Sequence, residues 1–158
     1  MSAIFTEDTY EQAIIELFEN MGYEHLYAPD LERDYSSPLL DFMLRDCLVR
    51  INRGLPLDAI EEAIAKLRIF DTGSLLQKNI LFMDYIQNGI TVKFFVKGEE
   101  QASIVRLIDY ENVKNNTFYV VNQFTFLENG NNRRPDIILF INGLPLVLME
   151  LKSPAKDE

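Results

Sequence analysis

The stretch that most constrains the fold runs from residue 133 to 152 and reads RRPDIILFINGLPLVLMELK. Two nearly unbroken apolar runs, Ile137–Ile141 and Leu144–Met149, flank the turn-forming dipeptide Asn142-Gly143. This pattern is typical of a β-hairpin. Because apolar residues occupy both faces of each strand, we expect the hairpin to lie in a central sheet that is covered from both sides.

The charged residues of this hairpin all lie at its open end. From Pro135 to Lys152 they are Asp136, Glu150 and Lys152. Side chains alternate along a strand, so Glu150 and Lys152 are expected on the same face. Two carboxylates and an ammonium would then meet at one end of an apolar sheet, which suits a divalent metal ion. A surface salt bridge at a sheet edge is the alternative interpretation of the same residues.

The metal-site hypothesis makes a demand on strand register. Cross-strand partners in an antiparallel hairpin have residue numbers with a constant sum, and partners share a face. Asp136 lies opposite Glu150 when that sum is 286, whereas a tight turn at Asn142-Gly143 gives 285. We therefore predict an odd-length loop, or a bulge with the same effect, and carboxylates of Asp136 and Glu150 close enough to share one cation.

The same residues carry a family resemblance. Asp136 followed by Glu150-Leu151-Lys152 resembles the PD-(D/E)xK nuclease motif. The longer string RRPDIILFINGLPLVLMELKSP is similar to the amino-terminal nuclease domain of the R (motor and restriction) subunit of type I restriction enzymes. The resemblance extends over most of the chain, including a first helix that ends in Met-Gly-Tyr and the segment FYVVNQF at 118–124.

The resemblance implies roles for particular residues. Asp136 and Glu150 would bind Mg²⁺, with the backbone carbonyl of Leu151 as a third ligand, and Lys152 would orient water and stabilise transition-state charge. Related nucleases often place a glutamate on the first helix, and the best match here is Glu11, ahead of Glu7 and Glu16. A solvated glutamate at the edge of that helix is the alternative.

Charge and composition limit how such a chain would work. Its 158 residues carry a net charge of −10, which argues against gripping DNA alone, because nonspecific affinity comes from Lys and Arg. The pair Arg133-Arg134 beside the proposed site is a candidate phosphate contact, although exposed arginines in turns are usually solvated. No apolar run reaches the ~20 residues of a membrane span.

The sequence gives little support for other catalytic chemistries. The one histidine, His25, has no Cys or His partner at zinc-ligand spacing. The one cysteine, Cys47, lies in an apolar helical pattern and is expected to pack in the core. A lone cysteine forms no internal disulfide, which fits a reducing cytoplasm.

The order of elements predicts the fold class. A first helix is expected from an N-cap at Thr6, with Phe5 packing against Tyr10, and it is followed by a polar connector over 23–36. Three helices are expected next, starting at Ser37-Pro38, at Asp58 with Glu61, and at Ser74 with Gln77. Strands are expected at about 90–97, 103–109, 118–127, 135–141 and 145–152. This order indicates an α+β fold with one mainly antiparallel sheet flanked by helices, and the resemblance makes it a PD-(D/E)xK nuclease core.

The expected organisation is a single nuclease domain over 1–158, with a helical insertion at 23–89 and a sheet at 90–152 that contains the catalytic hairpin 135–152. Ser153-Pro154 followed by acidic residues predicts a further helix start, so we expect an amino-terminal fragment of a larger chain. In the family, ATP-using motor domains and a region that contacts other subunits follow.

The leading hypothesis is a metal-dependent endonuclease domain that hydrolyses phosphodiester bonds of double-stranded DNA. It would be the restriction subunit of an ATP-dependent type I restriction-modification complex, a type I site-specific deoxyribonuclease, with Mg²⁺ as cofactor. The methylation and specificity subunits would be its partners in the cytoplasm. Two alternatives remain: a non-catalytic interaction module with a nuclease fold, and a nuclease of a repair or mobile-element system.

Overall fold

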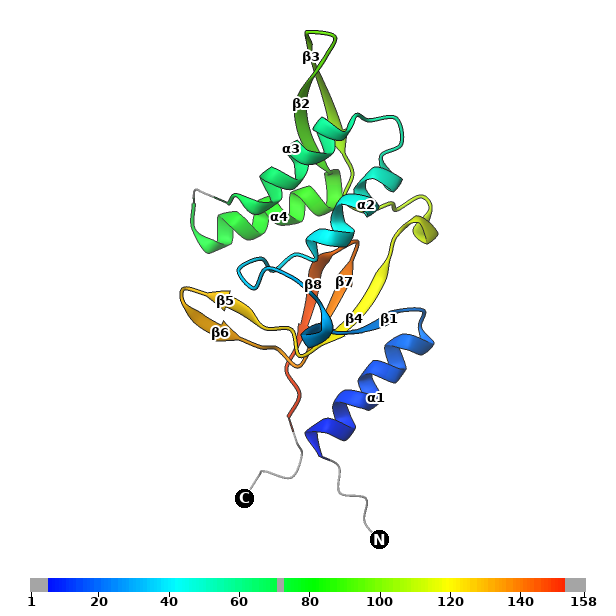
Figure 1. Cartoon of the computed structure of the whole chain (residues 1–158), viewed down its shortest axis with the longest axis vertical. Coiled ribbons are helices and arrows are strands. Elements are labelled where there is room, and N and C mark those ends of the chain that lie inside the picture. The colour runs from blue at the N-terminus through cyan, green and yellow to red at the C-terminus, as the bar shows by residue number, and fades with distance from the viewer. Residues whose placement is uncertain (1–5, 71–72, 153–158) are drawn as a thin grey trace. The chain divides into compact units, whose positions relative to one another are not determined.

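The computed structural model describes residues 6–70 and 73–152, and the chain divides into two compact units (Figure 1). The first unit is formed by the two ends of the chain, Met1–Leu40 and Thr117–Glu158, and the second by the middle, Asp41–Asn116. Helices and strands occur in both units, so the predicted α+β class is confirmed at this coarse level.

The elements of the first unit are α1 (Glu7–Asn20), β1 (Glu24–Tyr27), the 3-10 helix η1 (Ala28–Asp30), β4 (Phe118–Asn122), β5 (Phe126–Glu128), β6 (Asn131–Arg133), β7 (Ile137–Ile141) and β8 (Leu144–Met149). The elements of the second unit are α2 (Asp41–Ile51), α3 (Leu57–Arg68), α4 (Leu75–Asn88), β2 (Ile90–Val96), β3 (Glu99–Val105) and the 3-10 helix η2 (Val113–Asn115).

Helix α1 begins where the sequence predicts. Thr6 is its N-cap, and the side chains of Thr6 and Thr9 each accept a hydrogen bond from the other's backbone N–H, at 3.3 and 2.7 Å. This capping box satisfies two N–H groups that a helix start otherwise leaves without partners. Gly22, with φ of 98°, follows the helix end. Phe5 and the helix start expected at Ser153-Pro154 lie outside the described residues.

The main sheet has the strand order β1-β4-β7-β8, and β1 pairs parallel with β4 while the other pairs are antiparallel. Strand β1 falls in the segment predicted to be a polar connector, so that prediction is wrong. Its sequence EHLY lacks a clear apolar pattern. An edge strand does not need one here, because the side chains of β1 are at most half-buried. Backbone hydrogen bonds to β4, rather than an apolar pattern, define it.

The prediction of one continuous sheet is also wrong. In the described residues β2 and β3 form a separate hairpin, and so do β5 and β6. The expected strand over 118–127 ends at Asn122 because Gln123 adopts a left-handed conformation, with φ of 56°. The β5–β6 hairpin then turns at Asn129-Gly130, where φ is again positive.

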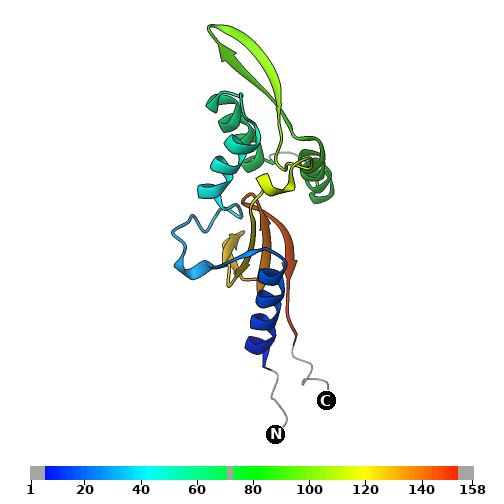
Figure 2. The same ribbon diagram turned by 90° about the vertical axis from the view of Figure 1, so that its right-hand side faces the viewer.

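One face of the main sheet is covered by α1 (Figures 1 and 2). The core between α1 and the sheet consists of four buried residues of α1, β4 and β7: Ile15, Val120, Ile137 and Leu139. Half-buried apolar residues pack around them: Ile14, Phe18, Tyr23, Met149 and Leu151. On β7 the expected burial from both sides is found. On β8 it is not, since Leu148 is 55% exposed.

In the second unit, the capping box of Ser74 and Gln77 and the helix end at Asn88-Gly89 are confirmed. Two other helix starts were predicted wrongly. Helix α3 follows Pro56 rather than using Asp58 as a cap, and α2 begins at Asp41, not at Ser37-Pro38. The Ser37 hydroxyl instead accepts a hydrogen bond from the N–H of Leu39, which makes a local turn.

Cys47 is buried in α2, as predicted for a core residue. Each helix within residues 6–70 and 73–152 is too short or too polar to cross a membrane.

Gly89 joins α4 to β2 in a position that excludes a side chain. Its φ is 80°, and a Cβ there would lie 2.7 Å from the carbonyl oxygen of Val105 and 2.7 Å from Cγ2 of Ile104. We expect Gly89→Ala to lower the free energy of unfolding by about 1–3 kcal/mol, measured by urea denaturation. Gly54→Ala is the matched control, because Gly54 has φ of 94° but nothing within 4 Å. An equal loss of unfolding free energy in the two variants would show that the contacts with Ile104 and Val105 are not the cause.

Asp109 organises the loop that ends the second unit. Its carboxylate accepts hydrogen bonds from the backbone of Asn112 at 2.8 Å, the side chain of Asn115 at 2.8 Å and the backbone of Glu111 at 3.1 Å. These bonds, that of Asn112 first, lower the pKa of Asp109 below its usual value. A carboxyl whose pKa is lowered by folding stabilises the fold above its unfolded pKa of about 3.9, and this stabilisation is lost as the pH falls through the folded-state pKa.

We therefore expect Asp109→Asn to destabilise the protein at pH 7, because an amide replaces one acceptor oxygen with a donor. The difference from wild type should shrink as the pH falls below about 4. Urea denaturation across this pH range measures it, with Glu99→Gln on exposed β3 as the control. A difference that stays constant with pH would exclude the carboxylate as its source.

Candidate active site

The β7–β8 hairpin contains the predicted register change. Near the turn Ile141 pairs with Leu144, so residue numbers add to 285, whereas Ile137 pairs with Met149, so they add to 286. The irregularity lies between Leu139 and Phe140 of β7, opposite the extra residue Leu146 of β8. The odd-length loop is therefore not found, and the stated alternative, a bulge with the same effect, is confirmed. If this register continued by one residue beyond the strands, Asp136 would lie opposite Glu150.

The two-residue turn is possible because Asn142 and Gly143 both adopt a left-handed backbone conformation. Asn142 and Gly143 both have positive φ, 54° and 87°, as two-residue hairpin turns require. Oδ1 of the buried Asn142 side chain accepts a hydrogen bond from the backbone N–H of Thr117 at 2.9 Å. The backbone N–H of Asn142 donates to the Thr117 carbonyl at 2.9 Å. These bonds fix the closed end of the hairpin and hence the position of its open end.

Asp136 lies immediately before β7 and is half-buried. Its Oδ2 accepts a hydrogen bond from the backbone N–H of Leu151 at 2.6 Å. Its carbonyl accepts the N–H of Gln123 at 3.2 Å. Asp136 is thereby held between the end of β4 and the chain that continues from β8, and its carboxylate lies against the backbone of Leu151.

Glu150 and Lys152 follow the end of β8 at Met149, and both are exposed. Because they lie beyond the regular strand, the expectation that they share a face stays a prediction, as does a cation shared by Asp136 and Glu150. Within residues 6–70 and 73–152, no three or more His, Cys, Asp or Glu side chains are grouped to hold a metal ion. A cation here would therefore depend on few side chains.

Glu11 is half-buried on α1 and is not a solvated edge glutamate. Its Oε1 accepts a hydrogen bond from Nδ2 of Asn122 at 2.6 Å, and its Oε2 accepts one from Nε2 of Gln123 at 2.9 Å. Gln123 also donates its backbone N–H to Asp136, so Glu11 is one residue removed from the candidate site. Glu7 and Glu16, the less favoured candidates, are both exposed.

Two residues of this region were not assigned to the site from sequence. Asn122 is only 4% exposed, and its Oδ1 lies 2.8 Å from Nε2 of His25 on the neighbouring strand β1. A signal for Asn122 was present in FYVVNQF, because an amide at the end of an apolar strand must find buried partners. His25 gave no signal, because its strand was not recognised.

The two arginines lie in and after β6. Arg133 forms an ion pair with Glu128 at 3.2 Å, and the two side chains are 64% and 56% exposed. Arg134 is exposed. A contact of either residue with a phosphate stays a prediction, and Arg133 would have to exchange its present partner.

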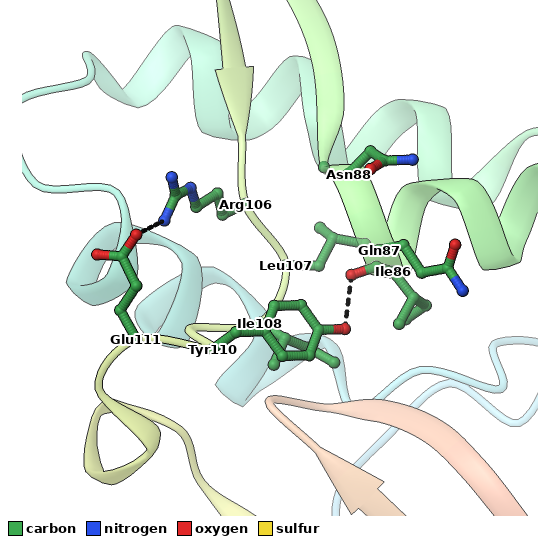
Figure 3. Close-up of a pocket in the computed structure, with 9 residues that line it drawn as sticks. Ile86, Gln87, Asn88, Arg106, Leu107, Ile108, Tyr110 and Glu111 are labelled. Atoms are coloured by element: carbon green, nitrogen blue, oxygen red, sulfur yellow. Dashed lines mark hydrogen bonds and ion pairs between the residues drawn. The ribbon is translucent and has the colours of Figure 1, made fainter.

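Figure 3 shows a cavity in the second unit of about 330 Å³. The end of α4 and residues 106–108, 110 and 111 line it, and the hydroxyl of Tyr110 donates to the carbonyl of Ile86 at 2.9 Å. None of the predicted site residues lines this cavity. The candidate site is instead the open end of the β7–β8 hairpin.

Comparison with known proteins identifies the family. Residues 4–158 match the family model of the type I restriction enzyme R protein N terminus. The chain belongs to this family. It is similar to the type I restriction enzyme HindI endonuclease subunit of Haemophilus influenzae, with 32% identity over 98% of this chain and 16% of the relative. It is also similar to the putative type I restriction enzyme MjaIXP endonuclease subunit of Methanocaldococcus jannaschii, with 31% identity over 94% of this chain and 15% of the relative.

The resemblance deduced from the hairpin is thus confirmed. The match to the R protein N terminus includes every residue assigned to the candidate site, from Glu11 to Lys152. The chain spans about a sixth of the length of these two relatives.

The bond from Leu151 to Asp136 makes a structural prediction that is independent of catalysis. Asp136→Ala leaves the Leu151 N–H without its acceptor, so we expect the free energy of unfolding to fall by about 1 kcal/mol. Asp136→Asn keeps an acceptor oxygen at this position and should cost less. Urea denaturation and hydrogen exchange of the Leu151 amide measure both effects. Unchanged exchange in Asp136→Ala would show that the bond is not formed in solution.

Proposed function

We propose that this chain is the metal-dependent DNA endonuclease domain of a type I restriction enzyme R subunit, with a PD-(D/E)xK core. The observation that carries the proposal is the register change in the β7–β8 hairpin. It places Met149 opposite Ile137, and this register, continued by one residue, would bring Glu150 opposite Asp136. The N–H of Leu151, the residue whose carbonyl is the third proposed ligand, binds the Asp136 carboxylate at the same end. Family membership supports the proposal independently.

The donor set fits Mg²⁺. Two carboxylates and a backbone carbonyl are oxygen ligands, and Mg²⁺ commonly binds proteins through one or two carboxylates while keeping several waters. The absence of a three-carboxylate cluster from the described residues is compatible with this mode. Bound Mg²⁺ would supply charge neutralisation and an activated water.

The side chains of the chain itself would do the rest. Asp136 and Glu150 would hold the cation, and Asp136 is already oriented by the N–H of Leu151. Lys152 would orient the attacking water and stabilise the negative charge that develops on the phosphate. Exposure of Glu150 and Lys152 leaves this end of the hairpin open to a DNA strand.

Delivery of DNA would depend on other parts of the enzyme. The net charge of −10 disfavours independent DNA binding, and Arg133 and Arg134 provide only a small local attraction for phosphate. We propose that ATP-driven motor domains of the subunit, together with methylation and specificity subunits, bring double-stranded DNA to the site.

The test uses charge-neutral variants of similar size in the R subunit that carries this chain, assembled with its partner subunits. We expect Asp136→Asn, Glu150→Gln and Lys152→Gln each to lower DNA cleavage by more than about 100-fold, the scale of losing one charge-stabilising group in a preorganised site. ATP hydrolysis should be retained, because it would belong to other domains. Glu16→Gln, at an exposed position of α1, is the matched control.

Metal binding provides a second measurement. Calorimetric titration of the 158-residue chain with Mg²⁺ should show weaker binding for Asp136→Asn and Glu150→Gln than for Glu16→Gln. Undiminished cleavage in all three site variants, with wild-type melting temperatures, would overturn the proposal and favour a non-catalytic interaction module.

A further inference from the structure

The carboxylate of Glu11 belongs to a hydrogen-bonded chain whose donors and acceptors can be assigned. A carboxylate only accepts hydrogen bonds, so the two amide groups beside it must both donate. Asn122 therefore directs its NH₂ group to Oε1 of Glu11 at 2.6 Å, and Gln123 directs its own to Oε2 at 2.9 Å. Both oxygens of Glu11 are thereby held.

The orientation of the Asn122 amide in turn determines whether Nε2 of His25 carries a proton. With its NH₂ group on Glu11, Asn122 presents Oδ1 to Nε2 of His25 at 2.8 Å. An amide oxygen only accepts, so Nε2 must carry a proton. The neutral Nε2–H tautomer and the imidazolium ion both meet this requirement. The chain therefore runs in one direction, from His25 through Asn122 to Glu11.

Burial makes this orientation hard to change. Asn122 is 4% exposed and ends β4, where it pairs with Ile137 of β7. Turning its amide over would set Oδ1 against the carboxylate of Glu11, at a cost that low exposure to water increases.

Gln123 connects the same network to the candidate site. Its left-handed backbone, with φ of 56°, costs energy in a residue other than glycine. In this conformation its backbone N–H binds the carbonyl of Asp136 at 3.2 Å while its side chain binds Glu11 at 2.9 Å. One residue thus fixes the spacing between Glu11 and Asp136.

We propose that His25, Asn122 and Gln123 are positioning residues that hold the Glu11 carboxylate ready to act at the same reaction centre as Asp136 and Glu150. A free glutamate side chain loses rotamer entropy when it is ordered, and a bonded one has already lost it. The inference rests on the proposed nuclease function. It adds to that function a set of supporting residues that act through Glu11.

The competing explanation is that the network only fastens α1 to the sheet. A double-mutant cycle separates the two, because a residue that acts through Glu11 has nothing to act on once Glu11 is neutral. In the assembled enzyme we expect His25→Ala to lower cleavage by about 10-fold, the scale of losing an outer-shell partner. In a Glu11→Gln background the same change should have little further effect.

A conservative variant tests whether the hydrogen bond from His25 to Asn122 is the cause of the effect. In His25→Gln the side-chain amide has an N–H donor near the position of Nε2, so Asn122 keeps its partner and cleavage should recover most of the loss. Glu16→Gln on the same helix is the control for charge. Effects of His25→Ala and Glu11→Gln that simply multiply would overturn the inference, as would wild-type cleavage by Glu11→Gln.

A third measurement needs neither metal nor DNA. Nitrogen-15 NMR of the 158-residue chain should find the Nε2 of His25 protonated. Glu11→Gln should shift the side-chain amide signals of Asn122 and Gln123, and Glu16→Gln should not. An unprotonated Nε2 would overturn the inference, as would amide signals of Asn122 and Gln123 that do not shift in Glu11→Gln.

The proposed function and the inference fail in different ways. Undiminished cleavage by Asp136→Asn, Glu150→Gln and Lys152→Gln would overturn the proposed nuclease function itself. Loss of cleavage in Asp136→Asn, combined with multiplicative effects of His25→Ala and Glu11→Gln, would leave the function standing and exclude His25 as a positioning residue.

Discussion

The alternation of side chains along a strand is the constraint on which the candidate site depends. A regular hairpin closed by the Asn142-Gly143 turn would keep the 285 register and place Asp136 and Glu150 on opposite faces. One extra residue, Leu146, shifts the register so that Met149 lies opposite Ile137. The tight turn, anchored to Thr117, and the bulge therefore work together: the turn fixes one end of the hairpin, and the bulge decides which residues meet at the other.

Buried amides tie the surrounding elements to that hairpin. Asn142 and Asn122 are both nearly inaccessible to solvent, and each bonds to groups far away in sequence. A buried polar group is expensive unless it is satisfied, so each amide permits only a narrow set of neighbouring positions. Asn142 holds the hairpin turn to the start of β4, and Asn122 holds α1 and β1 to its end. The candidate site thus lies where the apolar strands of the sheet end and their polar connections begin.

How far the sequence predicted this arrangement depends on the distance between interacting residues. The hairpin, the helix start at Thr6 and the Ser74 cap follow from neighbouring residues and were predictable. Strand β1 was not, because a polar edge strand has no apolar pattern and is defined by β4, nearly a hundred residues later in the chain. The break after Asn122 was hidden because Gln123 has no intrinsic preference for a left-handed backbone. Its bond to Asp136 exists only in the folded chain, and so do the bonds that the side chains of Asn122 and Gln123 donate to Glu11.

In the proposed site Asp136 would have two roles, a structural one and that of a metal ligand, and its two carboxylate oxygens make them compatible. A carboxylate has about four lone-pair positions on two oxygens, and the N–H of Leu151 uses one of those on Oδ2. Oδ1 and the remaining lone pair of Oδ2 are left for a cation. The bond to Leu151 also fixes the backbone between Glu150 and Lys152, so the residue proposed to bind metal also places the other two. The structural role of Asp136 and its proposed catalytic role would therefore separate only in a variant that removes its charge and keeps its shape.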